Sequence, residues 1–469
     1  MTGLDTEPTQ RRRIVGVEIE YGITHVGPGP ELGAEEAAQE LFNDPSLARG
    51  ANMFLPNGGR LYLDVGAHPE YATAECARLA DVLAQDRAGT EMLAALAERA
   101  TARLQERGVA GQIHLLRNNL DSAGSSFGCH ENYLIRRRFD FRRRVMGLVP
   151  HLVSRQVVAG AGHVRREQDG TARYVLSQRA DVVSEVVSAA TTRARPLINT
   201  RDEPHANHEL YRRLHIINAD TSMAEGSSLI NLASTALVLT ALEEGAQLED
   251  LELVDPIGAV RAISAQGSAR VELKNGQWLT GLELQAHYVE RTAHLAASDP
   301  DPVVRLGHEL WGRAVDALRA GREDEVADLL DHVAKRRLLE RHCERHGVGL
   351  DHASVATLEL AYHDITAHGL RARLEAAGLL RRFTTVAQVE AAQNSAPATR
   401  ASLRGAAIAA ALEYRRDLAA DWTTLRLLDR SLPAITLADP WETSNPAVAE
   451  LVAHLRSPER GATEAMLLL

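Results

Sequence analysis

Apolar and polar residues first alternate clearly over 12–21. Strict alternation predicts a half-buried β-strand. A second alternating stretch covers 60–65, and further strand-like runs, separated by turns rich in glycine and asparagine, lie at 112–117, 131–136, 173–177, 196–199 and 211–217. Helical spacing predicts a short helix over 35–42 and a long amphipathic helix over 77–107, which Gly108 ends.

The pattern changes to mostly helical spacing from about residue 224, interrupted by a hairpin signal at Lys274-Asn275-Gly276. Strands first and helices later favour an α+β fold over a parallel doubly wound sheet. Ser395-Ala396-Pro397 marks a boundary between two domains. We therefore expect a disordered N-terminal tip over 1–11, a main domain over 12–395 and a small C-terminal domain over 396–469.

Composition then excludes several classes of protein. The 469 residues are 45% hydrophobic, enough for a large core, and the net charge of −11 argues against a general nucleic-acid binder. The sequence has no apolar run of about 18 residues and no apolar N-terminal signal, so we expect no membrane association. Cys76, Cys129 and Cys343 lie far apart without a CxxC pair, which argues against disulfides or a thiolate zinc site. We expect a cytoplasmic protein.

The first strand carries two carboxylates on one face. Its alternation separates Val15, Val17, Ile19 and Tyr21 from Gly16, Glu18, Glu20 and Gly22. At ~3.3 Å per residue, Glu18 and Glu20 point the same way about 7 Å apart. Neighbouring like charges are unfavourable unless a cation lies between them, and Mg²⁺ or Mn²⁺ is the natural partner of oxygen ligands. A solvated polar face is the alternative interpretation.

The second strand repeats this arrangement. It separates Leu61, Leu63 and Val65, expected in the core, from Arg60, Tyr62 and Asp64. An arginine beside Asp64 would keep it ionised, and an ionised aspartate can accept a proton from an amine. The turn-rich segment over 66–76 adds His68, Glu70 and Glu75. An ordinary surface ion pair is the alternative here.

Arginines gather over 193–213, where Arg193, Arg195, Arg201, Arg212 and Arg213 suit a polyphosphate because guanidinium binds phosphate bidentately. Glu131 and Glu203 are further candidate metal ligands, whereas we interpret His205 and His215 as structural. Walker A, GxGxxG, HExxH and GxSxG motifs are absent from the sequence. These features favour a magnesium–nucleotide enzyme whose side chains, rather than a glycine loop, hold the phosphates.

Several longer segments resemble one family. They are 16–22 (GVEIEYG), 60–64 (RLYLD), 68–76 (HPEYATAEC), 128–134 (GCHENYL) and 198–205 (INTRDEPH). These segments are similar to those of the Pup–protein ligases, the proteasome accessory factor A family, whose sister family is the Pup deamidases/depupylases. The similarity extends from about residue 12 to past 450 and includes Asp421-Trp422.

This resemblance implies a glutamine-synthetase-like α+β fold, in which a curved antiparallel sheet packed with helices cradles ATP and Mg²⁺. It also implies a two-step reaction. The γ-phosphate of ATP passes to the side chain of the C-terminal glutamate of Pup, a small and mostly disordered protein modifier. A lysine of a target protein then displaces phosphate to form an isopeptide bond, which marks the target for proteasomal degradation.

The resemblance also assigns individual roles. Metal-site positions are Glu18, Tyr62 and Glu70. ATP contacts are Arg60, Thr73 and Trp422, and the catalytic acid/base is Asp64. We add Glu20 to the metal site because it shares a strand face with Glu18.

Three features favour a ligase over a depupylase. Asp64 is followed by 65–68 as in ligases, Cys129 precedes His130 where depupylases tend to have serine, and the segment over 22–60 has no room for a long extra loop. Two positions depart from the family pattern. Asn231 replaces an expected lysine, and the segment over 217–220 (INAD) differs from the usual Val-Gly-Asp. A depupylase, or a diverged non-catalytic paralogue that binds Pup, therefore remains an alternative.

Overall fold

The structure, a computed structural model, describes residues 13–29, 32–47, 50–121, 124–189, 195–428 and 432–457. The predicted N-terminal tip over 1–11 and Arg193 lie outside the described residues.

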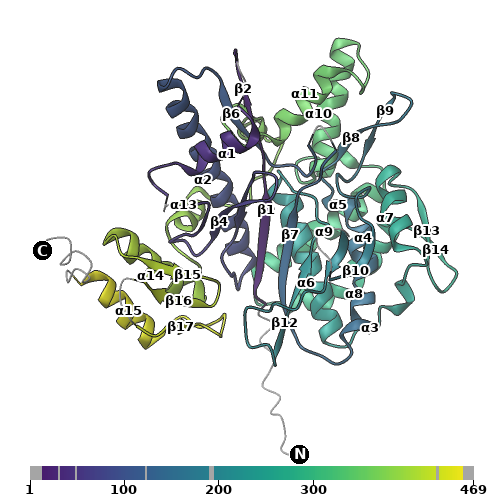
Figure 1. Ribbon diagram of the computed structural model, residues 1–469. Helices are drawn as coiled ribbons and strands as arrows, with labels where there is room; N and C mark the ends of the chain where they lie inside the picture. Colours follow the sequence, from purple (N-terminus) through teal and green to yellow (C-terminus); the bar gives the residue numbers. More distant parts are fainter. Residues whose placement is uncertain are drawn as a thin grey trace, which may run out of the picture.

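An eight-stranded sheet forms the centre of the molecule (Figure 1). Its order is β10-β11-β12-β7-β1-β5-β4-β3, and every neighbouring pair is antiparallel except β10 and β11. Its strands are β1 (Val15–Glu20), β3 (Asn52–Phe54), β4 (Arg60–Asp64), β5 (His68–Ala72), β7 (Cys129–Arg136), β10 (Glu185–Ser188), β11 (Pro196–Asn199) and β12 (Tyr211–Ile216).

The remaining strands form small sheets. They are β2 (Gly22–Val26) with β6 (Gln112–Leu116), β8 (His163–Arg166) with β9 (Ala172–Val175), β13 (Arg270–Glu272) with β14 (Trp278–Thr280), and β15 (Leu418–Ala420) with β16 (Thr424–Leu427) and β17 (Ile435–Thr436).

Helices make up most of the later chain, as the sequence predicts. They are α1 (Ala34–Phe42), α2 (Leu79–Glu106), α3 (Phe141–Met146), α4 (Val149–Ser154), α5 (Gln156–Ala159), α6 (Glu225–Glu243), α7 (Pro256–Ala265), α8 (Gly281–Ala297), α9 (Pro302–Arg319), α10 (Asp331–His346), α11 (Ala353–His363), α12 (Arg371–Ala376), α13 (Val386–Asn394), α14 (Arg400–Glu413) and α15 (Pro446–Arg456), with 3₁₀ turns η1 (Glu249–Leu251) and η2 (Glu323–Val326). The predicted α+β class is confirmed.

One face of the sheet is buried against helices. Val15 and Val17 of β1 join the apolar side chains of β7, β12, α6, α8 and α9 in the largest core cluster. Ile19 and Tyr21 belong to a second cluster with α1 and α2. The alternation predicted for β1 is therefore present, and Glu18 and Glu20 project from the opposite face.

The segment after β4 differs from its prediction. It forms strand β5, which pairs with both β1 and β4 instead of lying in a turn-rich stretch. The turn covers only 65–67, with positive φ angles at Gly66 (+88°) and Ala67 (+63°). Val65 is 90% exposed rather than in the core, because β4 ends at Asp64 and the chain turns there.

The last part of the chain, α14 to α15 with strands β15–β17, has an apolar cluster of its own that includes Ala407, Leu425, Leu437 and Leu451. Figure 1 shows it as a yellow-green lobe beside the central sheet. Whether 396–469 is an independent domain stays a prediction.

Helix α6 is the one helix within the described ranges that is long and apolar enough to cross a membrane. Within the apolar stretch of this helix, 83% is buried in the protein, which is typical of a core helix.

The two lysines of the chain have contrasting environments. Lys335, on α10, is fully buried, and its Nζ donates to the Gly162 carbonyl at 2.6 Å and lies 3.2 Å from Glu359 Oε1. Lys274 lies in the predicted hairpin between β13 and β14, where its half-exposed side chain pairs with Glu252 at 2.6 Å.

Candidate functional site

A cavity opens on the face of the sheet away from the helices. The start of β1, from Ile14 to Glu18, forms its floor together with residues 72–75 that follow β5. Asn132 and Arg213 line one side, and residues of the C-terminal lobe, including Trp422, line another. The lining is largely apolar, with Glu18, Glu75, Arg213 and Arg400 as its charged groups, which is typical of small-molecule sites.

A first polar cluster, at the Glu18 end of this cavity, joins three neighbouring strands. Glu18 pairs with His130 across β1 and β7, and its Oε2 lies 3.3 Å from His130 Nδ1. His215 of β12 brings Nε2 within 4.0 Å of the same oxygen. Asn132 Nδ2 donates to Glu18 Oε1 at 2.9 Å, and Arg213 lies 3.8 Å away.

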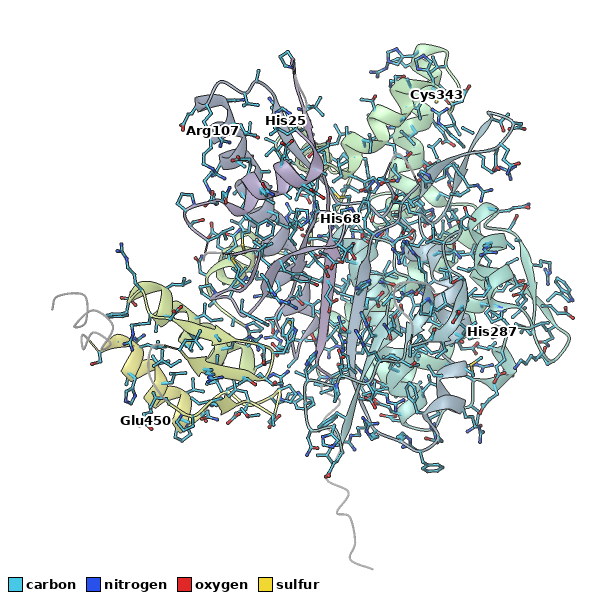
Figure 2. All side chains as sticks on the ribbon, in the orientation of Figure 1. His25, His68, Arg107, His287, Cys343 and Glu450 are labelled. Carbon is cyan, nitrogen blue, oxygen red and sulfur yellow. The ribbon has the colours of Figure 1, made fainter. Side chains whose placement is uncertain are left out.

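A second cluster lies one register step along the sheet. Glu20, Glu70 and Tyr62 are opposite one another on β1, β5 and β4, so their side chains form a row. Ligand atoms of Glu20, Asp64 and Glu70 all lie within 4.8 Å of one another. His68, labelled near the middle of Figure 2, places Nδ1 3.4 Å from Glu20 Oε2. Asp64 is the most exposed carboxylate of the three.

Gly128 makes this close approach possible. Its carbonyl accepts a hydrogen bond from the Glu20 backbone N–H at 3.1 Å. A Cβ at this position would lie 2.5 Å from both Glu20 Oε1 and His130 Nε2, so a larger residue would displace the carboxylate or the imidazole.

The clustered charges shift the pKa values of these groups in opposite directions. Burial raises the pKa of Glu70 well above its ordinary value, and the charges of Glu18 and Glu20 raise it further. Burial and the charges of Glu18 and Glu70 raise the pKa of Tyr62. Burial opposes ionisation of Glu18, but the hydrogen bond from His130 and the nearby cationic groups lower its pKa overall. Burial lowers the pKa of His215 to about 3, which leaves its imidazole neutral at pH 7.

The donor chemistry of both clusters fits a divalent cation. In the first, neither ring nitrogen of the buried His215 has a hydrogen-bond partner among the described residues. Either nitrogen could therefore bind a metal ion. In the second, three carboxylates crowd together, and Glu70 has no ion pair to an arginine within the described part of the chain. A cation would relieve both costs, because neutral imidazoles and carboxylates are its usual ligands.

The structure brings most of the predicted site residues together. Glu20, Tyr62, Asp64 and Glu70 share the second cluster, whereas Glu18 belongs to the first. Thr73 and Trp422 line the cavity, and Thr73 Oγ1 accepts from the Val17 N–H at 3.1 Å.

Arg60 is placed differently from Thr73 and Trp422. It is not among the described residues that line the cavity, and its guanidinium stacks 4.3 Å from the Tyr62 ring centroid and donates to Asn52. It therefore lies beside the second cluster.

Several polar residues are placed differently from their sequence interpretation. Of the predicted polyphosphate arginines, Arg213 lines the cavity, whereas Arg195 donates to the Ser126 carbonyl and Arg212 stacks on Phe141. His205 also lines the cavity, and His215 belongs to the first cluster. Strand register explains the placement of His215, since the pairing of β12 with β7 brings it opposite Asn132.

The expectation that Glu131 binds metal is wrong. Glu131 alternates with His130, so it faces the helices, where it is 1% exposed. Arg155 Nη2 lies 2.8 Å from its carboxylate, and Asn231 Nδ2 and Tyr133 Oη donate to it at 2.9 and 2.7 Å. Asn231, which departs from the family pattern, therefore contacts the helix-covered face and not the cavity. Asn218 of the second departure and Asn231 line one small cavity on that side.

A cavity that reaches Glu18, beside two groups of side chains that could hold a metal ion, is the arrangement of a nucleotide-dependent enzyme. Comparison with known proteins narrows the class. The family model described as Pup-ligase protein matches residues 13–426. The Pup–protein ligase of Xylanimonas cellulosilytica is 45% identical over 456 residues, covering 95% of this chain and 100% of that protein.

Two solved structures are also similar. The complex between Pup and its ligase PafA matches with a TM-score of 0.90 and 36% identity, covering 98% of this chain and 94% of the other. PafA in complex with ADP matches with a TM-score of 0.79 and 36% identity, over 92% and 97%. The chain belongs to the Pup ligase family, as its motifs predict.

Proposed function

We propose that the chain is an ATP-dependent Pup–protein ligase, which joins the C-terminal glutamate of Pup to lysines of target proteins. One observation carries the proposal. A cavity that reaches Glu18 lies beside two clusters of potential metal ligands, in a chain that aligns with Pup–protein ligases over nearly its whole length. The solved relatives with Pup and with ADP support the same partner and nucleotide.

The first step activates a carboxylate. A side-chain oxygen of the terminal glutamate attacks the γ-phosphorus of ATP, the new O–P bond replaces the bond to the bridging oxygen, and ADP leaves. Thr73 and Trp422 hold the nucleotide, and Arg60 contacts a phosphate. Glu18, Tyr62 and Glu70, with Glu20 as our addition, would hold Mg²⁺. When bound, Mg²⁺ supplies positive charge against the phosphates.

The second step forms the isopeptide bond. A lysine is protonated at pH 7, so its amine needs a base before it attacks the acyl carbon and phosphate departs. Asp64 is the base in our proposal because it is the most exposed member of its cluster and therefore reaches a substrate amine.

The remaining expectations belong to the same proposal. The main domain over 12–395 carries this chemistry, and 396–469 forms a small domain that contributes Trp422. We expect the enzyme to be cytoplasmic. Proteasomal degradation of the conjugates is the expected consequence.

A paired assay tests the function. Purified protein, ATP, Mg²⁺, a Pup ending in glutamate and a lysine-bearing target should yield a conjugate and ADP. The same protein given a pre-made conjugate should release little Pup. Release of Pup without net ADP formation would identify a depupylase instead, and Pup binding without either reaction would identify a non-catalytic paralogue.

Asp64→Asn separates chemistry from binding. This variant should still bind ADP but lose about 10²–10⁴-fold in conjugation rate, the usual contribution of a positioned acid/base. A variant with the full rate would remove Asp64 from the mechanism.

A further inference from the structure

We propose that Glu75, Arg400 and Arg404 form a positioning cluster that holds Trp422 against the cavity and so sets affinity for the adenine nucleotide. The inference rests on the proposed nucleotide site and adds three residues to which the motif comparison assigns no role. It makes the C-terminal lobe a determinant of ATP binding rather than an appendage.

Glu75 links the two parts of the chain. It follows Thr73 by two positions, lines the cavity and is 8% exposed. Its backbone carbonyl accepts from Thr399 Oγ1 at 2.7 Å, immediately before α14 begins. The segment after β5, which carries Thr73, is therefore bonded directly to the N-terminus of the first helix in the lobe.

Two arginines of α14 converge on the Glu75 carboxylate. They are four residues apart, so they lie on one face of the helix. Arg400 Nε lies 2.7 Å from Oε1, and Arg404 binds both carboxylate oxygens through Nη1 and Nη2. Both side chains are almost fully buried, and they hold the pKa of Glu75 at about 2 against the effect of burial. The Glu75 carboxylate is therefore ionised at neutral pH.

Arg404 also contacts Trp422 directly. Its Nη1 donates to the Trp422 carbonyl at 3.0 Å, and its guanidinium carbon lies 5.1 Å from the ring centroids of both Trp422 and Phe54. The two rings pack edge to face at 4.9 Å. Arg404 Nη2 donates to the Gly58 carbonyl at 2.8 Å, which connects this packing to the loop between β3 and β4.

This network fixes the position of one wall of the cavity. Trp422 lies in the bend between β15 and β16, a short surface segment, and its indole is only partly buried. Arg404 and Phe54 hold it from one side, while Glu75 holds Arg404. If the cluster is weakened, the indole loses its fixed position beside the nucleotide, whereas the carboxylate clusters on β1, β4 and β5 keep theirs. The effect should therefore fall on nucleotide affinity rather than on turnover.

Arg404→Lys and Glu75→Gln test this prediction. Arg404→Lys keeps the charge but loses the bidentate fork and the stacking geometry. For both variants we expect the KM for ATP to rise about 5- to 150-fold, the range of ordinary coupling between sites, with kcat changed less than about threefold. The ADP-dependent change in tryptophan fluorescence should shift to higher ADP by the same factor.

Arg87→Lys is the matched control. Arg87 forms a partly buried bidentate pair with Glu375, between α2 and α12, and does not line the cavity. This variant should lower the melting temperature while leaving the KM for ATP unchanged. If Arg404→Lys and Glu75→Gln melt cooperatively and keep the wild-type KM and ADP titration, the positioning role is overturned. If the wild type itself shows no ADP titration, the proposed nucleotide site fails first, and this inference fails with it.

Discussion

Buried glutamates on the two faces of the central sheet have opposite electrostatic surroundings. Glu131, facing the helices, is 1% exposed and has Arg155 at 2.8 Å. Glu70, facing the cavity, is 3% exposed and has Glu18 and Glu20 as its charged neighbours. Burial is the same, but only the first charge is balanced by the protein. A buried carboxylate is therefore a candidate ligand-binding group when the protein supplies no counter-ion to it. Burial and residue type alone do not distinguish the two glutamates.

Removing the Glu131 charge from the helix-covered face should have the largest effect, and it should fall on stability. Glu131→Gln leaves the Arg155 guanidinium buried without its partner, so we expect the free energy of unfolding to fall by about 3–5 kcal/mol. Denaturant unfolding measures this loss. Adding Arg155→Met should recover much of it, and conjugation by the folded fraction should persist in both variants. A large loss of turnover at unchanged stability would show that this face takes part in the chemistry.

Glu70→Gln should give the reverse outcome. It removes a charge that its neighbours repel, so the melting temperature should stay the same or rise. Conjugation should fall by about 10²–10³-fold, the usual cost of losing one electrostatic contact to the transition state. Thermal melting and single-turnover conjugation on the same preparation check the two effects together. A destabilised but active variant would contradict the contrast between the faces.

Acid stability should report on Glu75, a balanced carboxylate that belongs to the cavity wall. Its pKa is lowered from 4.5 to about 2 by Arg404 and Arg400, whose effect exceeds that of burial. A lowered pKa in the folded state stabilises the protein above the unfolded value, so this contribution is complete above about pH 5 and is lost as the pH falls toward 2. The shift corresponds to about 3 kcal/mol at 1.36 kcal/mol per pKa unit.

Urea unfolding between pH 6 and pH 3 measures this contribution. Glu75→Gln should flatten the pH dependence of unfolding in that window relative to the wild type. An identical pH dependence in the two proteins would show that Glu75 is not held ionised by its arginines.

Asn231→Lys should have the smallest effect. Asn231 lines a small cavity in which Gln156 Oε1 and Asn218 Oδ1 have no hydrogen-bond partner among the described residues. A lysine ammonium would supply donors there, but it would lose the hydrogen bond that Asn231 donates to Glu131 and would bring a buried charge, so we expect stability to change by less than about 1 kcal/mol. Conjugation should change less than about twofold, since the site faces the other way. A stronger effect on activity would reveal coupling between the faces.

Local pattern predicts part of this arrangement well. Alternation in β1 and β4 places Glu18, Glu20, Tyr62 and Asp64 on a common face, because period two is a property of a single strand. Strand β5 is not predicted because Pro69 within it argues against a strand. It forms because it hydrogen-bonds to strands on both sides.

Long-range pairing accounts for the rest. His130 and His215 are 85 positions apart in sequence, and only the register of β12 on β7 brings His215 to the Glu18 carboxylate. Glu75 and Arg404 are 329 positions apart. No spacing rule connects residues at such separations, so the contacts that complete the cavity wall emerge only from the folded chain.

The burial of Lys335 has a practical consequence for any study of this enzyme. With its ammonium enclosed by Gly162 and Glu359, the chain offers one exposed ε-amine, that of Lys274 at the tip of a hairpin. An amine-reactive dye at a pH above neutrality should therefore label one side chain, besides the α-amino group. The protein thus carries a ready-made single attachment point for fluorescence or surface immobilisation, on an element that contributes nothing to the cavity.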